Sequence, residues 1–289
     1  GPDRVRVGGA CGAPPPETLK VGVNTIAGFR NLMTFVLCGL DIEAKAALVR
    51  GQLEESIGKD GLEVVLARTD HADATDTETA SALLHVHLRD RDPRRAGRAF
   101  SAAAVELALA SYPGCTLTTP PGDATPYGVF TAEFVPQESV EHVAVLPSGE
   151  RVAIPPPAGG ADPERPPEQR LAAAGPARHP TRRMPLGELV GARSGDKGGD
   201  ANLGVWARTD RAYDWLRGWL GTERLRQLLP ETSGLTVERY ELPNVRALNF
   251  VIRGLLGQGV AASTRFDPQA KALGEVLRSR MVDVPEELL

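Results

Sequence analysis

The chain has 289 residues, of which 42% are hydrophobic and 24% charged, and its formal net charge is −4. This length is enough for two domains that each bury a core. The acidic balance excludes a general affinity for nucleic acid or for an anionic membrane surface, so any anionic ligand needs a local site. Three widely spaced cysteines form no disulfide framework, which fits a reducing compartment. Since no apolar run approaches the roughly 20 residues of a membrane helix, we expect a cytoplasmic protein without a membrane partner.

The first domain is predicted at residues 1–154, where strands with alternating apolar residues are interleaved with two helices. Asp41 begins the first helix and Gly58 closes it. Residues 28–31 are interpreted as a small polar turn. In chain order the predicted elements are a strand at 20–26, a helix at 41–58, strands at 62–67 and 82–88, a helix at 97–111 and a strand at 140–146. This order is that of a ferredoxin-like split βαβ sandwich.

Residues 155–183 interrupt the chain with eight prolines in 29 residues. Such a segment buries too little apolar surface to offset its ordering entropy, so it is predicted to be a linker. The second domain follows at 184–289, with strands at 187–192, 202–207, 235–242 and 247–253, a helix capped by Thr209 or Asp210, and a closing helix at 267–281. We therefore predict an α+β protein of two ferredoxin-like α/β sandwich domains joined by a Pro-rich linker.

The segment 193–200, Arg-Ser-Gly-Asp-Lys-Gly-Gly-Asp, is predicted to be a tight loop between two short strands. Its glycines permit positive φ and bring backbone N–H groups close to a ligand, which favours an anion site. Arg193 and Lys197 add positive charge, and Asp196 and Asp200 are candidates for orienting the cations or for acid/base chemistry. The alternative is a charged hairpin whose side chains are merely solvated. The spacing is not that of a Walker phosphate loop.

A second glycine cluster, at 254–259, follows the strand at 247–253. Asn249 and Gln258 would supply directional hydrogen bonds if this turn lies beside the first loop, although a purely structural turn is the favoured interpretation of the glycines. His85 and His87 share one strand face but lack a third ligand, so no metal site is predicted. The sequence holds no nucleophile elbow, dinucleotide fingerprint or zinc signature, and so it specifies no cofactor.

Several dispersed segments together resemble the acyclic terpene utilisation family. They are residues 191–202, 237–244 and 247–250 in the second domain, and 28–31, 39–45, 97–101 and 105–114 in the first. The resemblance covers nearly the whole chain except the linker, and it implies a ferredoxin-like fold for the last hundred residues or so. It also implies that the chain corresponds to the C-terminal half of a longer protein, as a fragment, as a processed product or as a split subunit whose N-terminal half is a separate chain. Asp200 departs from the pattern, because Asn or a small polar residue is expected there.

The resemblance implies a catabolic role, and two hypotheses follow. In the first, the chain is part of an enzyme of the lyase, hydratase or hydrolase type, acting on a carboxylate or acyl-CoA-like, branched-chain substrate. In the second, it is a non-catalytic assembly or regulatory subunit that binds the N-terminal half. A homo-oligomer is expected in both. The first hypothesis assigns catalysis to Asp196 and Lys197, and binding of a small anionic ligand to Arg193, Ser194, Gly195, Gly198, Gly199, Asp200, Asn202, Asn249 and Gln258.

Overall fold

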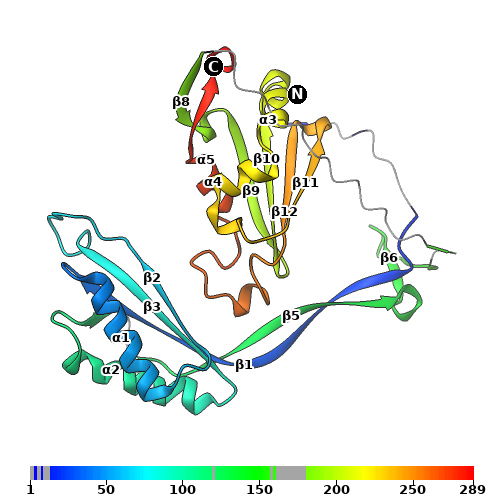
Figure 1. The fold of residues 1–289 in the computed structure, drawn as a ribbon. Helices are drawn as coiled ribbons and strands as arrows, with labels where there is room; N and C mark the ends of the chain where they lie inside the picture. Colours follow the sequence, from blue (N-terminus) through cyan, green and yellow to red (C-terminus); the bar gives the residue numbers. More distant parts are fainter. Residues whose placement is uncertain (1–2, 5–7, 9–13, 119–120, 157–158, 161–179) are drawn as a thin grey trace. The chain divides into compact units, whose positions relative to one another are not determined.

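The computed structural model describes residues 3–4, 8, 14–118, 121–156, 159–160 and 180–289 (Figure 1). Most of the predicted linker and Cys11 therefore lie outside the described residues. The fold mixes helices with antiparallel sheets. Contacts divide the chain into two compact units, which are not contiguous in sequence. The first comprises Gly1–Val23, Phe130–Leu255 and Gln269–Leu289, and the second comprises Asn24–Val129 and Leu256–Pro268. We call the second the N-terminal unit and the first the C-terminal unit.

The N-terminal unit is built on one sheet with the strand order β2-β3-β1-β4, and β5 pairs with β1 outside this path. Its elements are β1 (Thr18–Cys38) from Asn24 on, α1 (Ile42–Ile57), β2 (Leu62–Ala67), β3 (Ser81–Asp90), a π-helical turn (Arg95–Ala99), α2 (Phe100–Ala110), β4 (Thr116–Leu117) and β5 (Thr125–Pro136) as far as Val129. From β1 to β4 the elements follow the predicted order β-α-β-β-α-β, although the last strand of that order is β4 and not the one expected at 140–146. Strand β2 has the predicted bounds, and α1 starts after Asp41 and ends before Gly58 as expected.

The core of this unit lies between the sheet and its two helices. Alternate residues of β1 and β3, such as Phe35 and Val86, are fully buried, as period-two alternation requires when one face of a sheet is covered. Val49 and Leu53 of α1, four residues apart, and Phe100 of α2 bury their side chains in the same cluster. These contacts fix which face of the sheet is available for other partners.

Two expectations about this unit are wrong. Residues 28–31 form no turn, because they lie inside the long strand β1. Gly28 permits this continuity: its φ is 155°, and a Cβ there would lie 2.7 Å from the carbonyl oxygen of Asp90. The strand expected at 140–146 is the shorter β6 (His142–Val145), which in the described part of the chain pairs with β7 (Arg151–Ile154) in a separate hairpin that groups with the C-terminal unit. The edge of the main sheet is β4 instead.

The C-terminal unit contains a four-stranded sheet of order β11-β12-β10-β9 and a small sheet of β13 and β8. Its elements are β8 (Thr181–Pro185), β9 (Val190–Lys197), β10 (Asp200–Ala207), α3 (Asp210–Trp219), α4 (Thr222–Leu228), β11 (Val237–Leu242), β12 (Ala247–Ile252), α5 (Leu273–Arg278) and β13 (Met281–Pro285). The predicted cap is confirmed, because the Thr209 side chain accepts a hydrogen bond from the backbone N–H of Ala212 at 3.2 Å.

Two expectations about the C-terminal unit are also wrong. Residues 193–200 are not a loop, since β9 and β10 run through them and only Gly198 and Gly199 form the turn. The closing helix is confined to α5, and Met281 begins β13. In both cases pairing with a neighbouring strand outweighs local propensity. None of the helices in the described residues is long and apolar enough to cross a membrane.

Candidate functional site

The β9–β10 hairpin presents its side chains to two opposite faces of the C-terminal sheet. Leu203 and Phe250 are fully buried, so their face is the one that packs in the core. Ser194 pairs with Leu203 and therefore shares the core face. Arg193 and Asn249 both pair with Gly204 in the strand register and lie on the opposite face. We call that opposite face the polar face; it carries Arg193, Gly195, Lys197, Asp200, Asn202, Gly204, Glu238, Tyr240, Asn249, Val251 and Arg253.

The polar face brings together Asn202 and Asn249, two of the residues predicted to bind a ligand. Asn202 Nδ2 donates a hydrogen bond to Asn249 Oδ1 at 2.8 Å, and both side chains are half-buried. This bond uses one donor of Asn202 and one acceptor site of Asn249, so both amides keep further hydrogen-bonding capacity. Arg193 is exposed on the far side of Gly204 from Asn249. A guanidinium and two amides therefore border one position above Gly204.

Two glycines on the polar face have no conformational or packing reason to be glycine within the described residues. Neither Gly195 nor Gly204 has a positive φ. A Cβ at Gly195 would meet nothing within 4 Å, and one at Gly204 would be 3.8 Å from the Arg193 carbonyl oxygen. Gly191 differs, because the indole of Trp206 fills the space of its missing side chain. Glycine weakens a strand interior, and it is typical of sites where a ligand or another backbone approaches closely.

A network of ion pairs borders these amides. Arg253 bonds Asp200 Oδ2 at 2.6 Å and both carboxylate oxygens of Glu238 at 2.9 and 3.1 Å. Hydrogen bonds to Glu238 and to Asp200 raise the pKa of Arg253 above its ordinary value. The Tyr240 hydroxyl donates to Glu238 Oε2 at 2.8 Å. Asp200 also accepts the backbone N–H of Gly254 at 2.8 Å. Its carboxylate therefore positions Arg253 and the start of the glycine-rich segment.

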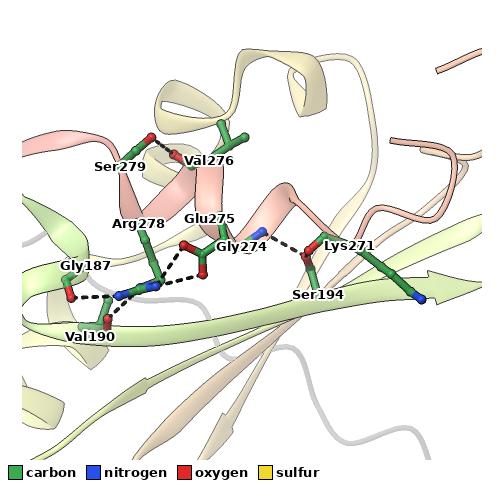
Figure 2. A network of polar contacts seen from close by, with 9 residues as sticks. All are labelled: Gly187, Val190, Ser194, Lys271, Gly274, Glu275, Val276, Arg278 and Ser279. Carbon is green, nitrogen blue, oxygen red and sulfur yellow. Dashed lines mark hydrogen bonds and ion pairs between the residues drawn. The ribbon is translucent and has the colours of Figure 1, made fainter. Parts of the chain in front are cut away.

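Ser194, another predicted ligand-binding residue, points to the core face and caps α5. Its hydroxyl oxygen accepts the backbone N–H of Gly274 at 2.9 Å and donates to the Lys271 carbonyl at 3.2 Å (Figure 2). Nearby, Arg278 pairs with Glu275 and donates to the Val190 carbonyl at 3.3 Å. These contacts join β9 to α5, which gives Ser194 a structural role.

The remaining predicted residues are dispersed. Asp196 pairs with the buried Ala201 and so lies on the side opposite Arg193 and Asn202. Lys197 is exposed at the hairpin end, where its ammonium donates to the Asp196 carbonyl at 3.1 Å. Gly198 and Gly199 form the turn, and Gly198 has a φ of 66°. Gln258 is exposed and belongs to Leu256–Pro268, which groups with the N-terminal unit.

Sequence reasoning missed Gly204, Glu238, Tyr240 and Arg253. The alternation of side chains along a strand could have indicated them, because residues two or four positions apart share one face. Glu238 and Tyr240 are two residues apart on β11, and Asn249 and Arg253 are four residues apart along β12 and its end. A strand register was needed to show that these pairs lie on the same face as Asn202. Within the described residues, no three His, Cys, Asp or Glu side chains form a group that could hold a metal ion.

The N-terminal unit brings together two segments that carry the family resemblance. Asn31 Nδ2 donates to the Gly122 carbonyl at 2.9 Å and to Ser101 Oγ at 3.3 Å, and the Ser101 hydroxyl donates to the same carbonyl at 2.6 Å. A cavity of about 340 Å³ lies beside them, lined in part by Arg98 and Asp123. Since the polar atoms of this group satisfy one another, a structural role explains it.

Two family models match the chain. The model of the acyclic terpene utilisation family protein AtuA matches residues 1–146, and the model of the AtuA ferredoxin-like domain matches residues 184–283. The first match covers just over half of the chain, and the two leave the predicted linker between them. No curated protein and no solved structure gives a significant match. The family is implicated in the use of acyclic terpenes, which is a catabolic role. The chain belongs to the acyclic terpene utilisation (AtuA) family.

Proposed function

We propose that the chain is part of a catabolic enzyme that acts on a carboxylate or acyl-CoA-like, branched-chain substrate. In this proposal the anionic group of the substrate binds on the polar face above Gly204, between Arg193 and the amides of Asn202 and Asn249. The observation that carries the proposal is the pair of strand-interior glycines, Gly195 and Gly204, which nothing in the described residues requires. A ligand that approaches the backbone closely gives these positions a reason to lack side chains.

The electrostatics of the polar face favour an anion. Its cations are Arg193, Lys197 and Arg253 and its carboxylates are Asp200 and Glu238, so three positive charges meet two negative charges. Arg253 is already engaged by both carboxylates, which leaves the exposed Arg193 as the cation nearest to the open position. A guanidinium binds a planar carboxylate through two parallel hydrogen bonds, so Arg193 suits this ligand.

The acid/base role is assigned to Tyr240 and Glu238 rather than to Asp196, because Asp196 lies on the other side of β9. Tyr240 and Asn249 are paired in the register, and the Tyr240 hydroxyl is held by Glu238 at 2.8 Å. A tyrosine hydroxyl within reach of a carboxylate can move a proton to or from a substrate oxygen. In this proposal proton transfer takes place next to the binding amides, as a lyase or hydratase requires.

The second candidate function is assembly with another chain, because a closely approaching backbone also explains Gly195 and Gly204. The N-terminal half of the family, or a second copy of this chain, would then cover the polar face. The two functions differ in what covers the polar face. In the first it is a small anion, and in the second it is the surface of another protein chain.

Calorimetric titration with 3-methylbutanoate, its CoA thioester and free CoA tests the proposal. We expect Gly204→Val to abolish carboxylate binding while the protein stays folded, because valine favours a strand and fills the ligand position. Asn249→Ala should weaken binding about tenfold, the effect of losing one hydrogen bond to a charged group. Asn244→Ala, the same change in an exposed turn, is the control. Unchanged binding in Gly204→Val would refute the site.

A further inference from the structure

The N-terminal sheet has a second polar surface, on the face opposite α1 and α2. Arg30 pairs with Arg89 and Thr34 pairs with His85 in the register of β1 and β3, and His87 lies between His85 and Arg89 on the same side. Glu63 of β2 pairs with His87 and joins this face. We call these six residues the histidine face. The helix-covered face is mostly apolar, with Asn31 as a polar exception that bonds Ser101 of α2, whereas the histidine face gathers two guanidiniums and two imidazoles.

A segment from far along the sequence lies on the histidine face. Residues Leu256–Pro268 group with the N-terminal unit, and we call them the cover segment. Arg30 Nη1 donates a hydrogen bond to the Ala261 carbonyl, and Arg89 Nη1 donates to the Ala262 carbonyl at 3.0 Å. Two consecutive carbonyl oxygens therefore occupy the two arginines. These two neutral carbonyl oxygens occupy the positions that the two oxygens of a bound carboxylate would take.

Two further contacts join the cover segment to the histidine face. Thr264 Oγ1 donates to Glu63 Oε1 at 2.5 Å, and the Phe266 ring meets the His85 ring edge-on with centroids 4.6 Å apart. Phe266 is nevertheless 65% exposed, so it closes only one side of the histidine. Both arginine contacts are made by backbone carbonyls of the segment, whose buried side chains include Leu256 at its start and the small Ala262. A local opening of the segment therefore frees both arginines at once.

In the described part of the chain, one of the two arginines forms an ion pair with a carboxylate and the other does not. Arg89 reaches Glu63 at 3.3 Å, but Arg30 forms no ion pair within the described residues. Hydrogen bonds between a guanidinium and a carboxylate are roughly twice as strong as those to a neutral acceptor. A small carboxylate can therefore compete with the Ala261 and Ala262 carbonyls for the same donors.

His85 supplies a third, independent indication of a ligand. Its Nδ1 lies 2.9 Å from Thr34 Oγ1, whereas its Nε2 is buried and has no hydrogen-bond partner in the described part of the chain. Burial lowers the pKa of His85, which favours the neutral ring. With Thr34 as the donor to Nδ1, Nε2 carries the proton and is available to a ligand oxygen. Buried polar atoms in proteins rarely lack a hydrogen-bond partner, so we expect a ligand oxygen to accept the proton of this nitrogen.

We propose that the histidine face is a second anion site, for a small carboxylate held by Arg30, Arg89 and His85, and that the cover segment is displaced when the carboxylate binds. The site lies within the N-terminal unit and uses no residue of the polar face, so it is independent of the proposed function. Gly257 and Gly259, which have φ values of 56° and 99°, give the segment backbone conformations that other residues rarely adopt, and they allow it to rearrange near its start.

Hydrogen exchange of the cover segment tests this proposal directly. The protein is titrated with 3-methylbutanoate, with inorganic phosphate and with the neutral 3-methylbutanamide. We expect the carboxylate, but not the amide, to speed exchange of residues 256–268 several-fold, because it takes the donors that hold them. Arg30→Gln should weaken this response about tenfold. Arg50→Gln, the same change on the exposed surface of α1, should leave it unaltered. A response to phosphate alone would identify a phosphate site instead and overturn the carboxylate assignment.

A second readout follows the His85 imidazole by nitrogen NMR in the wild-type protein, so the result does not depend on any variant folding. The Nε2 signal should move on carboxylate addition and keep moving in Asn249→Ala, which separates this site from the polar face. Unchanged exchange and an unchanged His85 signal at saturating carboxylate would overturn the proposal. So would an equal response to the amide, since charge would then play no part.

Discussion

Gly191 and Trp206 share one space: a Cβ built on Gly191 would lie 2.3 Å from Cε2 of the indole. The two residues are paired across β9 and β10, and the ring lies over the glycine. Gly204, two residues before Trp206 on β10, has no such occupant. The same strand pair thus contains Gly191, whose missing side chain makes room for Trp206, and Gly204, for which no neighbouring side chain requires a glycine.

This contrast predicts opposite effects for the same substitution. Gly191→Ala should lower the free energy of unfolding by about 1–3 kcal/mol, the usual cost of overpacking. Gly204→Ala should raise it by roughly 0.5–1 kcal/mol, because alanine reduces the entropy of the unfolded chain. Urea unfolding measures both. Adding Trp206→Ala to Gly191→Ala should remove most of the cost; if it does not, the indole is not the cause.

Ser194 is predicted to contribute to stability rather than to ligand binding. Ser194→Ala removes the acceptor for the Gly274 N–H and should cost about 1 kcal/mol, as is typical of a lost helix cap. Hydrogen exchange at α5 should rise while exchange at α3 stays constant. Carboxylate affinity should be unchanged in the same variant. A loss of affinity without a loss of stability would instead return Ser194 to the binding site.

The Asp200 carboxylate offers a matched pair of substitutions. Asp200→Asn keeps an acceptor for the Gly254 N–H but removes the charge that faces Arg253, whereas Asp200→Ala removes both. The Asn variant should therefore lose less than 1 kcal/mol, because the pair is partly exposed. The Ala variant should lose roughly 1 kcal/mol more. Equal losses in urea unfolding would show that the Gly254 bond contributes nothing.

The histidines predict a pH dependence of stability. Burial lowers the pKa of both His85 and His87 in the folded protein, so the unfolded chain binds protons more readily. Stability should be fully present above the ordinary histidine pKa of about 6.5 and should fall as the pH drops below it. His85→Gln combined with His87→Gln should flatten this dependence between pH 7.5 and 5.5. Parallel curves for the variant and the wild type would contradict the assignment.

The carboxylate of Asp210 affects stability in a lower pH range than the histidines do. The Arg246 guanidinium bonds the Asp210 carboxylate and holds the pKa of Asp210 below its usual range. Stability from this pair is present above the ordinary aspartate pKa of about 3.9 and is lost below it. Unfolding measured at pH 5.5 and above therefore reports the histidines without interference from this aspartate.

Strong local signals made parts of the fold predictable. The strand β2 and the start of α1 at Asp41 followed from periodicity and an end signal, and Thr209 was recognisable as a cap. The β9–β10 hairpin was not predictable as strand, because its glycines and charges resemble a loop and it is extended through the pairing of β9 with β10 and of β10 with β12. That pairing depends on residues about 50 positions away, which no local window contains.

The same limit applies to the candidate site. Asn202 and Asn249 were recognised individually, and their contact could be expected once both were placed on neighbouring strands. Reading residues 193–200 as a loop hid the alternation that sends Ser194 and Arg193 to opposite faces. The contact of the cover segment with the histidine face could not be predicted for another reason. Arg30 and Ala261 are 231 positions apart, and a single sequence contains no indication of a contact over that distance.

The cover segment also constrains when the protein can finish folding. The histidine face belongs to strands that end at Asp90, yet residues 256–268 are synthesised about 165 residues later. During translation at about 5–20 residues per second, the two arginines therefore lack their partner carbonyls for on the order of ten seconds. The nascent sheet thus spends that interval with a polar surface open to solvent, and a truncated chain that ends before residue 256 keeps it open permanently.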